Sequence, residues 1–153
     1  MQKQKRFQRG FTLIELLVVI AIIGLLATVV VVSLNSARTK ARDARRKTDM
    51  QASAKALELY AGQNASYPVH ATAVVSTSAC GAWIAELTVA YILALPCDPK
   101  EASYHYYYAT DATGKKYELN AFMEKDTAAA ANDGGNNNVW YEVGSDLTLM
   151  GAH

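Results

Sequence analysis

The residues with the clearest chemical potential lie near the start of the chain, where Gly10 precedes Phe11 and Glu15 follows four residues later. Glu15 is the only charged residue in the stretch 11–32, which is otherwise apolar apart from two threonines. An ionised acid in a membrane helix costs roughly 2.5–3.5 kcal/mol at the helix centre and less near its end. This cost predicts a functional partner for Glu15. The plainer alternative is an acid that reaches the membrane surface.

The apolar stretch that contains Glu15 is long enough to cross a bilayer, because about 20 apolar residues span its core as a helix. Four basic residues and no acid precede it, which favours a cytoplasmic N-terminus. An ordinary secretory signal has a shorter apolar region that ends in a small-residue cleavage site. Ser36-Ala37 is a poor site of that kind. The sequence therefore predicts a membrane helix that the mature protein keeps.

Residues 9–20 (RGFTLIELLVVI) resemble the prepilin signature of type IV pilins and type II secretion pseudopilins. The resemblance covers residues 1–68 well and the remainder loosely. It implies that residues 1–10 are a leader, that a membrane-embedded prepilin peptidase cuts between Gly10 and Phe11, and that Phe11 is then N-methylated. Gly10 suits such a cut because a residue without a Cβ lets extended backbone enter a narrow protease site.

The same resemblance gives Glu15 an assembly role, in which its carboxylate pairs with the new amine of Phe11 on a neighbouring subunit. A close ion pair offsets much of the cost of two isolated charges among apolar helices. The implied function is a structural filament subunit, single-pass in the inner membrane before assembly and part of an extracellular pilus afterwards. Its implied partners are further copies of itself, the peptidase, the assembly platform and minor pilins.

Two alternatives to a pilus subunit stay open at this stage. One is a type II secretion pseudopilin in a periplasmic piston, favoured by Leu95-Pro96-Cys97-Asp98-Pro99, which resembles the LPxDP element of pseudopilin heads. The resemblance gives Asp98 a structural role as a cap for the loop backbone. The other is a DNA-uptake (competence) pilin, suggested by six basic residues and one acid within residues 38–47.

The basic stretch 38–47 argues against direct nucleic-acid binding on closer inspection. Its basic residues wrap around a helix instead of sharing one face, and no aromatic residue is interleaved for base stacking. The prediction is a solvated basic collar or a partner for acidic heads in the filament. From residue 48 onward the chain has 5 basic and 12 acidic residues, a net charge of −7.

The remaining pattern predicts an α+β pilin fold, in which a long N-terminal helix packs on a small antiparallel sheet. Helix-forming residues without proline follow the apolar stretch, so one helix is expected from about residue 12 to about residue 62. Strands are expected at 104–110, 116–123 and 139–143, with a hairpin turn at 111–114 between the first two, and a short helix at 82–93. The predicted divisions are the leader 1–10, the membrane and assembly helix 11–35, and the distal helix half with its globular head, 36–153.

The chain has two cysteines, Cys80 and Cys97, which enclose 16 residues. An even pair in an exported head fits a disulfide, whereas two cysteines without further ligands make a poor zinc site. Some pseudopilins bind calcium in a C-terminal loop, which makes Asp126, Asp133 and Asp146 candidate ligands. The EF-hand pattern is absent from residues 126–139, and a flexible polar loop is the plainer reading.

The sequence carries no enzyme signature. The three histidines are scattered, and no nucleophile elbow, phosphate-binding loop or metal-ligand spacing occurs. The expectation is a structural protein that needs no cofactor, apart from the candidate calcium.

Overall fold

The computed structural model describes residues 11–76, 80–87 and 90–151 and confirms the α+β fold. Its elements are α1 (Leu13–Asn64), β1 (Val74–Val75), the 3₁₀ turn η1 (Ala85–Leu87), β2 (Tyr106–Thr110), β3 (Tyr117–Phe122), α2 (Thr127–Ala131) and β4 (Trp140–Gly144). The chain divides into two compact units, residues 1–38 and 39–153. We call the second unit the head.

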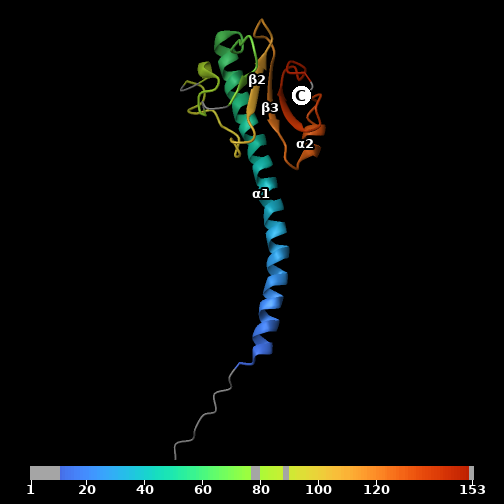
Figure 1. Cartoon of the computed structure of the whole chain (residues 1–153). Helices are drawn as coiled ribbons and strands as arrows, with labels where there is room; N and C mark the ends of the chain where they lie inside the picture. The colour runs from blue at the N-terminus through green and yellow to red at the C-terminus, as the bar shows by residue number, and fades with distance from the viewer. Residues whose placement is uncertain (1–10, 77–79, 88–89, 152–153) are drawn as a thin grey trace, which may run out of the picture. The chain divides into compact units, whose positions relative to one another are not determined.

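The head contains one antiparallel sheet with strand order β1-β2-β3-β4 (Figure 1). The three predicted strands are present, and the hairpin turn between β2 and β3 lies where it was expected. The Asp111 carboxylate holds this turn by accepting the backbone N–H groups of Lys115 and Lys116 at 2.7 and 2.8 Å. The two-residue strand β1 was not predicted, because Val74 and Val75 are too short a run to show alternation.

The core lies between the sheet and the half of α1 that belongs to the head. Strand residues alternate between two faces, and one face carries Tyr106, Tyr108, Leu119 and Ala121 to the same buried cluster as Met50, Leu57 and other residues of α1. The Tyr106 hydroxyl donates to Asp49 of α1 at 2.8 Å, which satisfies this buried phenol. Tyr106 and Tyr108 are therefore core residues.

The predicted helix at 82–93 is wrong for the residues that the structure describes, where only the short turn η1 forms. Twelve helical residues would extend about 18 Å. The two ends of this segment instead meet, since Leu95 donates its N–H to the carbonyl of Gly81 at 2.9 Å. Cys80 and Cys97 form a disulfide just outside that contact, with their Cα atoms 5.7 Å apart. A loop closed at both ends has no room for a straight helix.

The polar segment 126–139 is also more ordered than a plain flexible loop, because it begins with the helix α2. The Asp126 side chain accepts the backbone N–H of Ala129 at 3.3 Å and so caps the helix N-terminus. An Asp followed by a threonine and four alanines has the sequence of such a cap. The low complexity of the segment hid it from the sequence analysis.

The prediction of a solvated collar is wrong for three of its six basic residues. Arg46 is completely buried. Its guanidinium donates to both carboxylate oxygens of Asp98, at 2.6 and 2.8 Å, and to Asp43 and Glu124, each at 2.8 Å. Such bidentate Arg–carboxylate pairs are strong and directional. The structural role predicted for Asp98 thus includes the neutralisation of a buried arginine, in addition to its bond from the N–H of Lys100 at 2.7 Å.

The other two inward-facing cations of the collar are Arg42 and Lys47. Arg42 binds both carboxylate oxygens of Glu124 at 2.7 and 2.8 Å, and Lys47 binds Asp126 at 2.6 Å. The hydrogen bonds from Arg42, joined by those from Arg46, hold the pKa of Glu124 at about 2 although its burial opposes the shift. Arg38, Lys40 and Arg45 are exposed, as the collar prediction required.

Asp43 is an acidic partner of Arg46 that also binds backbone N–H groups. Its buried carboxylate accepts the N–H groups of three consecutive residues, Glu124, Lys125 and Asp126, at 3.0, 2.8 and 3.0 Å. A single side chain of α1 therefore binds the backbone of the segment that follows β3. We call Asp43, Arg46, Asp98 and Glu124 the buried ion cluster.

Replacing Arg46 by methionine should lower the stability of the head by about 3–5 kcal/mol, because Asp98 and Asp43 would stay buried without their counter-ion. Arg45→Met is the matched control. Arg45 is exposed and lies 3.7 Å from Asp49, so this variant should stay within about 0.5 kcal/mol of the wild type. Urea unfolding of the full chain in detergent micelles measures both. Equal losses in the two variants would contradict the role given to Arg46.

A second prediction concerns Ala65, which ends α1 with a φ of 59°. This left-handed conformation costs a residue with a Cβ roughly 1–2 kcal/mol, and glycine adopts it without that cost. Ala65→Gly should therefore stabilise the head by about 0.5–1 kcal/mol. Ala52→Gly, at an exposed position inside α1, should destabilise it by about 1 kcal/mol. A loss of stability in both variants would count against this reading of the helix end.

The Cys80–Cys97 disulfide leads to a third prediction. On the chain-entropy estimate, closing a loop of this length stabilises the head by about 3 kcal/mol. The double variant with serine at both positions should lose that amount in urea unfolding. The folded wild type should show two titratable thiols only after reduction, and two free thiols without reductant would exclude the bridge.

Candidate functional site

The N-terminus of α1 carries the residues that the sequence singled out for processing and assembly. Gly10 lies outside the described residues. Phe11 is described, and its side chain is 82% exposed. Glu15 lies in the first turn of α1, where one of its carboxylate oxygens accepts the backbone N–H and the hydroxyl of Thr12 at 2.8 and 2.7 Å. The Thr12 hydroxyl in turn accepts the N–H of Glu15 at 3.2 Å.

Thr12 is a residue at this site that the sequence had not singled out, and it binds Glu15. Thr12 and Glu15 form a reciprocal capping box, in which each side chain binds the backbone of the other and so satisfies two of the first free N–H groups of the helix. The T-x-x-E spacing was visible in the sequence as the signal for it. The consequence is that Glu15 sits on the first turn of the helix, close to the backbone N–H of the residue that follows Phe11.

The surface of α1 that follows Glu15 is apolar on all sides and is not covered by any described part of the chain. Its large apolar side chains from Leu16 to Leu34 are between 44% and 71% exposed. Thr28 satisfies its hydroxyl within the helix by donating to the carbonyl of Leu25 at 2.7 Å. Among the described helices, α1 alone is long and apolar enough to cross a membrane. Such a surface needs lipid or other apolar helices around it.

The three candidate calcium ligands do not meet in the structure. Asp126 caps α2 and pairs with Lys47, and Asp146 pairs with Lys116 at 2.8 Å. Asp133 accepts the backbone N–H groups of Gly135 and Glu142, both at 2.8 Å. Within residues 11–76, 80–87 and 90–151, no three His, Cys, Asp or Glu side chains are grouped as a metal site would require.

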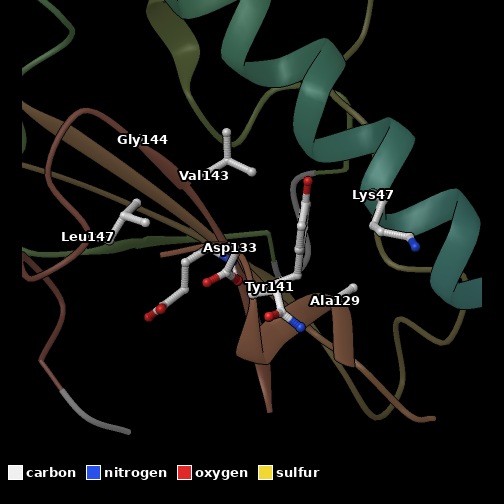
Figure 2. A pocket seen from close by; sticks show the side chains of 9 residues that line it. Lys47, Ala129, Asp133, Tyr141, Val143, Gly144 and Leu147 are labelled. Atoms are coloured by element: carbon white, nitrogen blue, oxygen red, sulfur yellow. Dashed lines mark hydrogen bonds between the residues drawn. The ribbon is translucent and has the colours of Figure 1, made fainter. Parts of the chain in front are cut away.

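A cavity of about 510 Å³ lies in the head between α1, α2 and β4. Figure 2 shows Lys47 on α1 at one side of it and Tyr141, Val143 and Leu147 at the other. Asp133 and Glu142 also line it. Glu142 is almost completely buried, and the sequence analysis gave it no role because a glutamate in a short strand normally faces water.

Comparisons with known proteins give separate family matches for the N-terminal part of the chain and for the part that contains the head. Residues 5–31 match the family model of the prokaryotic N-terminal methylation motif, and residues 33–139 match that of type II secretion system protein G. No solved structure gives a significant match.

The matched relatives include both secretion and pilus proteins. The type II secretion system core protein G of Dickeya chrysanthemi is 34% identical over 110 residues, which cover 65% of this chain and 68% of the relative. The same-named protein of Pseudomonas aeruginosa is 45% identical over 65 residues, 42% of this chain and 46% of the relative. The type IV wide pilus major component PilA4 of Thermus thermophilus is 42% identical over 71 residues, 46% of this chain and 54% of the relative.

In most of these matches the chain spans about half the length of the curated relatives. The family model for the head nevertheless matches well over half of the chain, and the model for the methylation motif matches the residues before it. The chain therefore belongs to the type II secretion system protein G family.

Proposed function

We propose that the chain is a structural subunit of a type IV pilus-like filament, inserted in the inner membrane and polymerised through α1. The prepilin peptidase cuts after Gly10 and methylates the new N-terminus on Phe11. The role is structural, without catalysis. The observation that carries the proposal is the uncovered apolar surface of α1, directly preceded by a methylation motif that spans residues 5–31.

The physical mechanism is an exchange of apolar surroundings. In the membrane, lipid covers the apolar side chains of α1, and in the filament the same side chains pack against α1 of other subunits. The apolar surface stays out of water in both states, so the transfer costs little hydrophobic free energy. The ion pair between Glu15 and the Phe11 amine of a neighbour then selects the axial register, because a slipped pairing leaves two charges without partners.

The capping box supports this mechanism because Thr12 already holds the Glu15 carboxylate in position in the single subunit, before assembly. Both hydrogen bonds from Thr12 reach one carboxylate oxygen of Glu15. Thr12 leaves the other oxygen of this carboxylate to the acceptor role that we assign to it, toward the amine of the neighbouring subunit. A carboxylate can accept several hydrogen bonds at once, so assembly need not break the cap.

The filament is proposed to be an extracellular pilus that is built by an assembly platform with minor pilins. The relatives include a secretion system core protein G and a type IV wide pilus major component. Recovery of the subunit in filaments sheared from the cell surface supports a pilus. A subunit that stays in the periplasm would exclude the pilus and leave a secretion pseudopilus.

Glu15→Leu should leave cleavage and membrane insertion intact and reduce filaments at least tenfold, because the Phe11 amine loses its partner. Glu101→Leu makes the same chemical change at an exposed position in the head and should assemble normally. Electron microscopy and immunoblots of sheared surface material measure filaments. Normal filaments from the Glu15 variant would contradict the proposed assembly mechanism.

Processing is tested separately by N-terminal sequencing and mass spectrometry of the mature subunit. The first residue should be Phe11 with one added methyl group. Gly10→Val should block the cut by placing a branched side chain in the protease site, and the uncut precursor should stay in the membrane fraction. Efficient cleavage of that variant, or a mature protein that begins elsewhere, would contradict the proposed junction.

A further inference from the structure

The face of the sheet that points away from α1 holds three polar side chains that are hidden from water. Glu118 and Asn120 on β3 have no exposed surface, and Glu142 on β4 is 2% exposed. Their neighbours Leu119 and Ala121 point to the opposite face, into the core with α1. Burying two carboxyl groups is costly unless their charges are neutralised or paired. We call Glu118, Asn120 and Glu142 the polar triad.

Strand register places the three side chains next to each other. Asn120 lies directly opposite Glu142, and Glu118 is diagonal to it across the β3–β4 pair. Backbone bonds from Met123 to Val139 and from Ser145 to Tyr117 show that the odd-numbered residues of β3 form the hydrogen-bonded pairs. Asn120 and Glu142 are therefore a non-hydrogen-bonded pair, the type in which the side chains approach more closely.

Four polar atoms of the triad have no hydrogen-bond partner within the described part of the chain. They are one carboxylate oxygen of Glu118, one of Glu142, and both the oxygen and the nitrogen of the Asn120 amide. The remaining oxygens are used, since Glu118 accepts the N–H of Met150 at 2.8 Å and Glu142 that of Asn137 at 3.4 Å. Native proteins rarely leave so many buried polar atoms unsatisfied in one place.

The charged groups around Glu142 do not neutralise it. Glu118 faces it from β3 and Asp133 from the loop before β4, and both are acidic. Lys47 of α1 lines the same cavity (Figure 2) but is ion-paired with Asp126 at 2.6 Å. The helix α2 contains only threonine and alanine. Burial raises the pKa of Glu142, and the charges of Glu118 and Asp133 add to this shift against the bonds from the loop backbone.

We propose that the polar triad holds one proton on Glu142 and acts as a pH-dependent latch for the C-terminal segment 132–150. The protonated carboxyl of Glu142 donates to the amide oxygen of Asn120. The amide nitrogen of Asn120 donates to the free oxygen of Glu118. One proton thus gives a partner to all four unsatisfied atoms, and the triad carries one negative charge instead of two. The Asn120 amide can turn by 180° to present either end to either neighbour.

The C-terminal segment is the part that this proton controls, because it is attached to the triad at several points. Asp133 takes the N–H of Glu142, and Met150 donates to Glu118. Gly135 packs directly on the Glu142 carboxylate, where an added Cβ would lie 1.5 Å from an oxygen. Loss of the proton from Glu142 adds a second negative charge beneath the segment 132–150. The segment then loosens, so that water reaches the charged carboxylate.

The direction of the pH effect follows from the raised pKa of Glu142. A carboxyl that is easier to protonate in the folded state contributes stability below its unfolded pKa, near 4.3. That contribution is lost as the pH rises through the higher folded pKa. The head should therefore be less stable in alkali than at mildly acid pH.

The test is thermal unfolding of the full chain in detergent micelles between pH 5 and 9, with EDTA present. The wild-type Tm should fall as the pH rises. Glu142→Gln keeps a donor for Asn120 without the titration, so its Tm should be flat over this range and exceed the wild type at pH 9 by about 3 °C or more. Glu101→Gln, at an exposed acid, should follow the wild type.

Asn120→Asp supplies a second, opposite variant, since it adds a third carboxylate to the triad and should make the fall in Tm steeper. Hydrogen–deuterium exchange should show protection of residues 132–150 decreasing at pH 9 in the wild type and not in Glu142→Gln. An unchanged pH slope in Glu142→Gln overturns the proposal. So does a rise in the wild-type Tm with 1 mM Ca²⁺ that Glu142→Gln abolishes, because a cation would then occupy the place given to the proton.

Discussion

The head depends on one buried arginine and the carboxylates that surround it. Arg46 reaches from α1 to Asp98 after the disulfide-closed loop and to Glu124 after β3, so three distant segments meet at one guanidinium. Its planar fork of donors suits this geometry, whereas a lysine would offer a single point charge. Asp43, one helical turn earlier, adds the backbone of residues 124–126. The segment that leads into α2 is thereby fixed to α1 by polar contacts.

The same helix serves two different environments along its length, and the change occurs within a few residues. Up to Leu34 its large side chains are exposed and, apart from Glu15, apolar, while from Asp43 onward it has one face buried in the head. A helix provides its own backbone hydrogen bonds in either environment, which explains why one uninterrupted element can serve both. The basic residues at the transition divide accordingly: some neutralise acids of the head and others remain in water.

The fold was predictable wherever local pattern and tertiary environment agreed. The apolar stretch, the alternating strands and the Asp111 turn depend on neighbours in sequence, and the structure has them where the pattern placed them. The burial of Arg46 was not predictable, because its partners Asp98 and Glu124 lie 52 and 78 residues away. The helix predicted within the loop at 81–96 was wrong for a related reason. Its helical composition is overruled by the contact between its two ends.

The candidate residues also divide into those that local sequence reveals and those that depend on the tertiary structure. Phe11 and Glu15 were found from a short motif, and Thr12 could have been found from its spacing to Glu15. Glu142 could not, since only the pairing of β3 with β4 and the loop above it reveal that the side chain is buried.

The bond between Asp133 and the N–H of Glu142 has a consequence for a protein that is crowded with its own copies. β4 is an edge strand, and Glu142 is the central one of its residues whose backbone N–H points outward from the sheet. An open edge is a template on which identical strands can add, which leads to amyloid-like aggregation. The carboxylate occupies the central donor of that edge, and the opposite edge, β1, has only two residues. Strand addition is thereby opposed at both edges of the sheet, which agrees with the proposed assembly through the apolar helix.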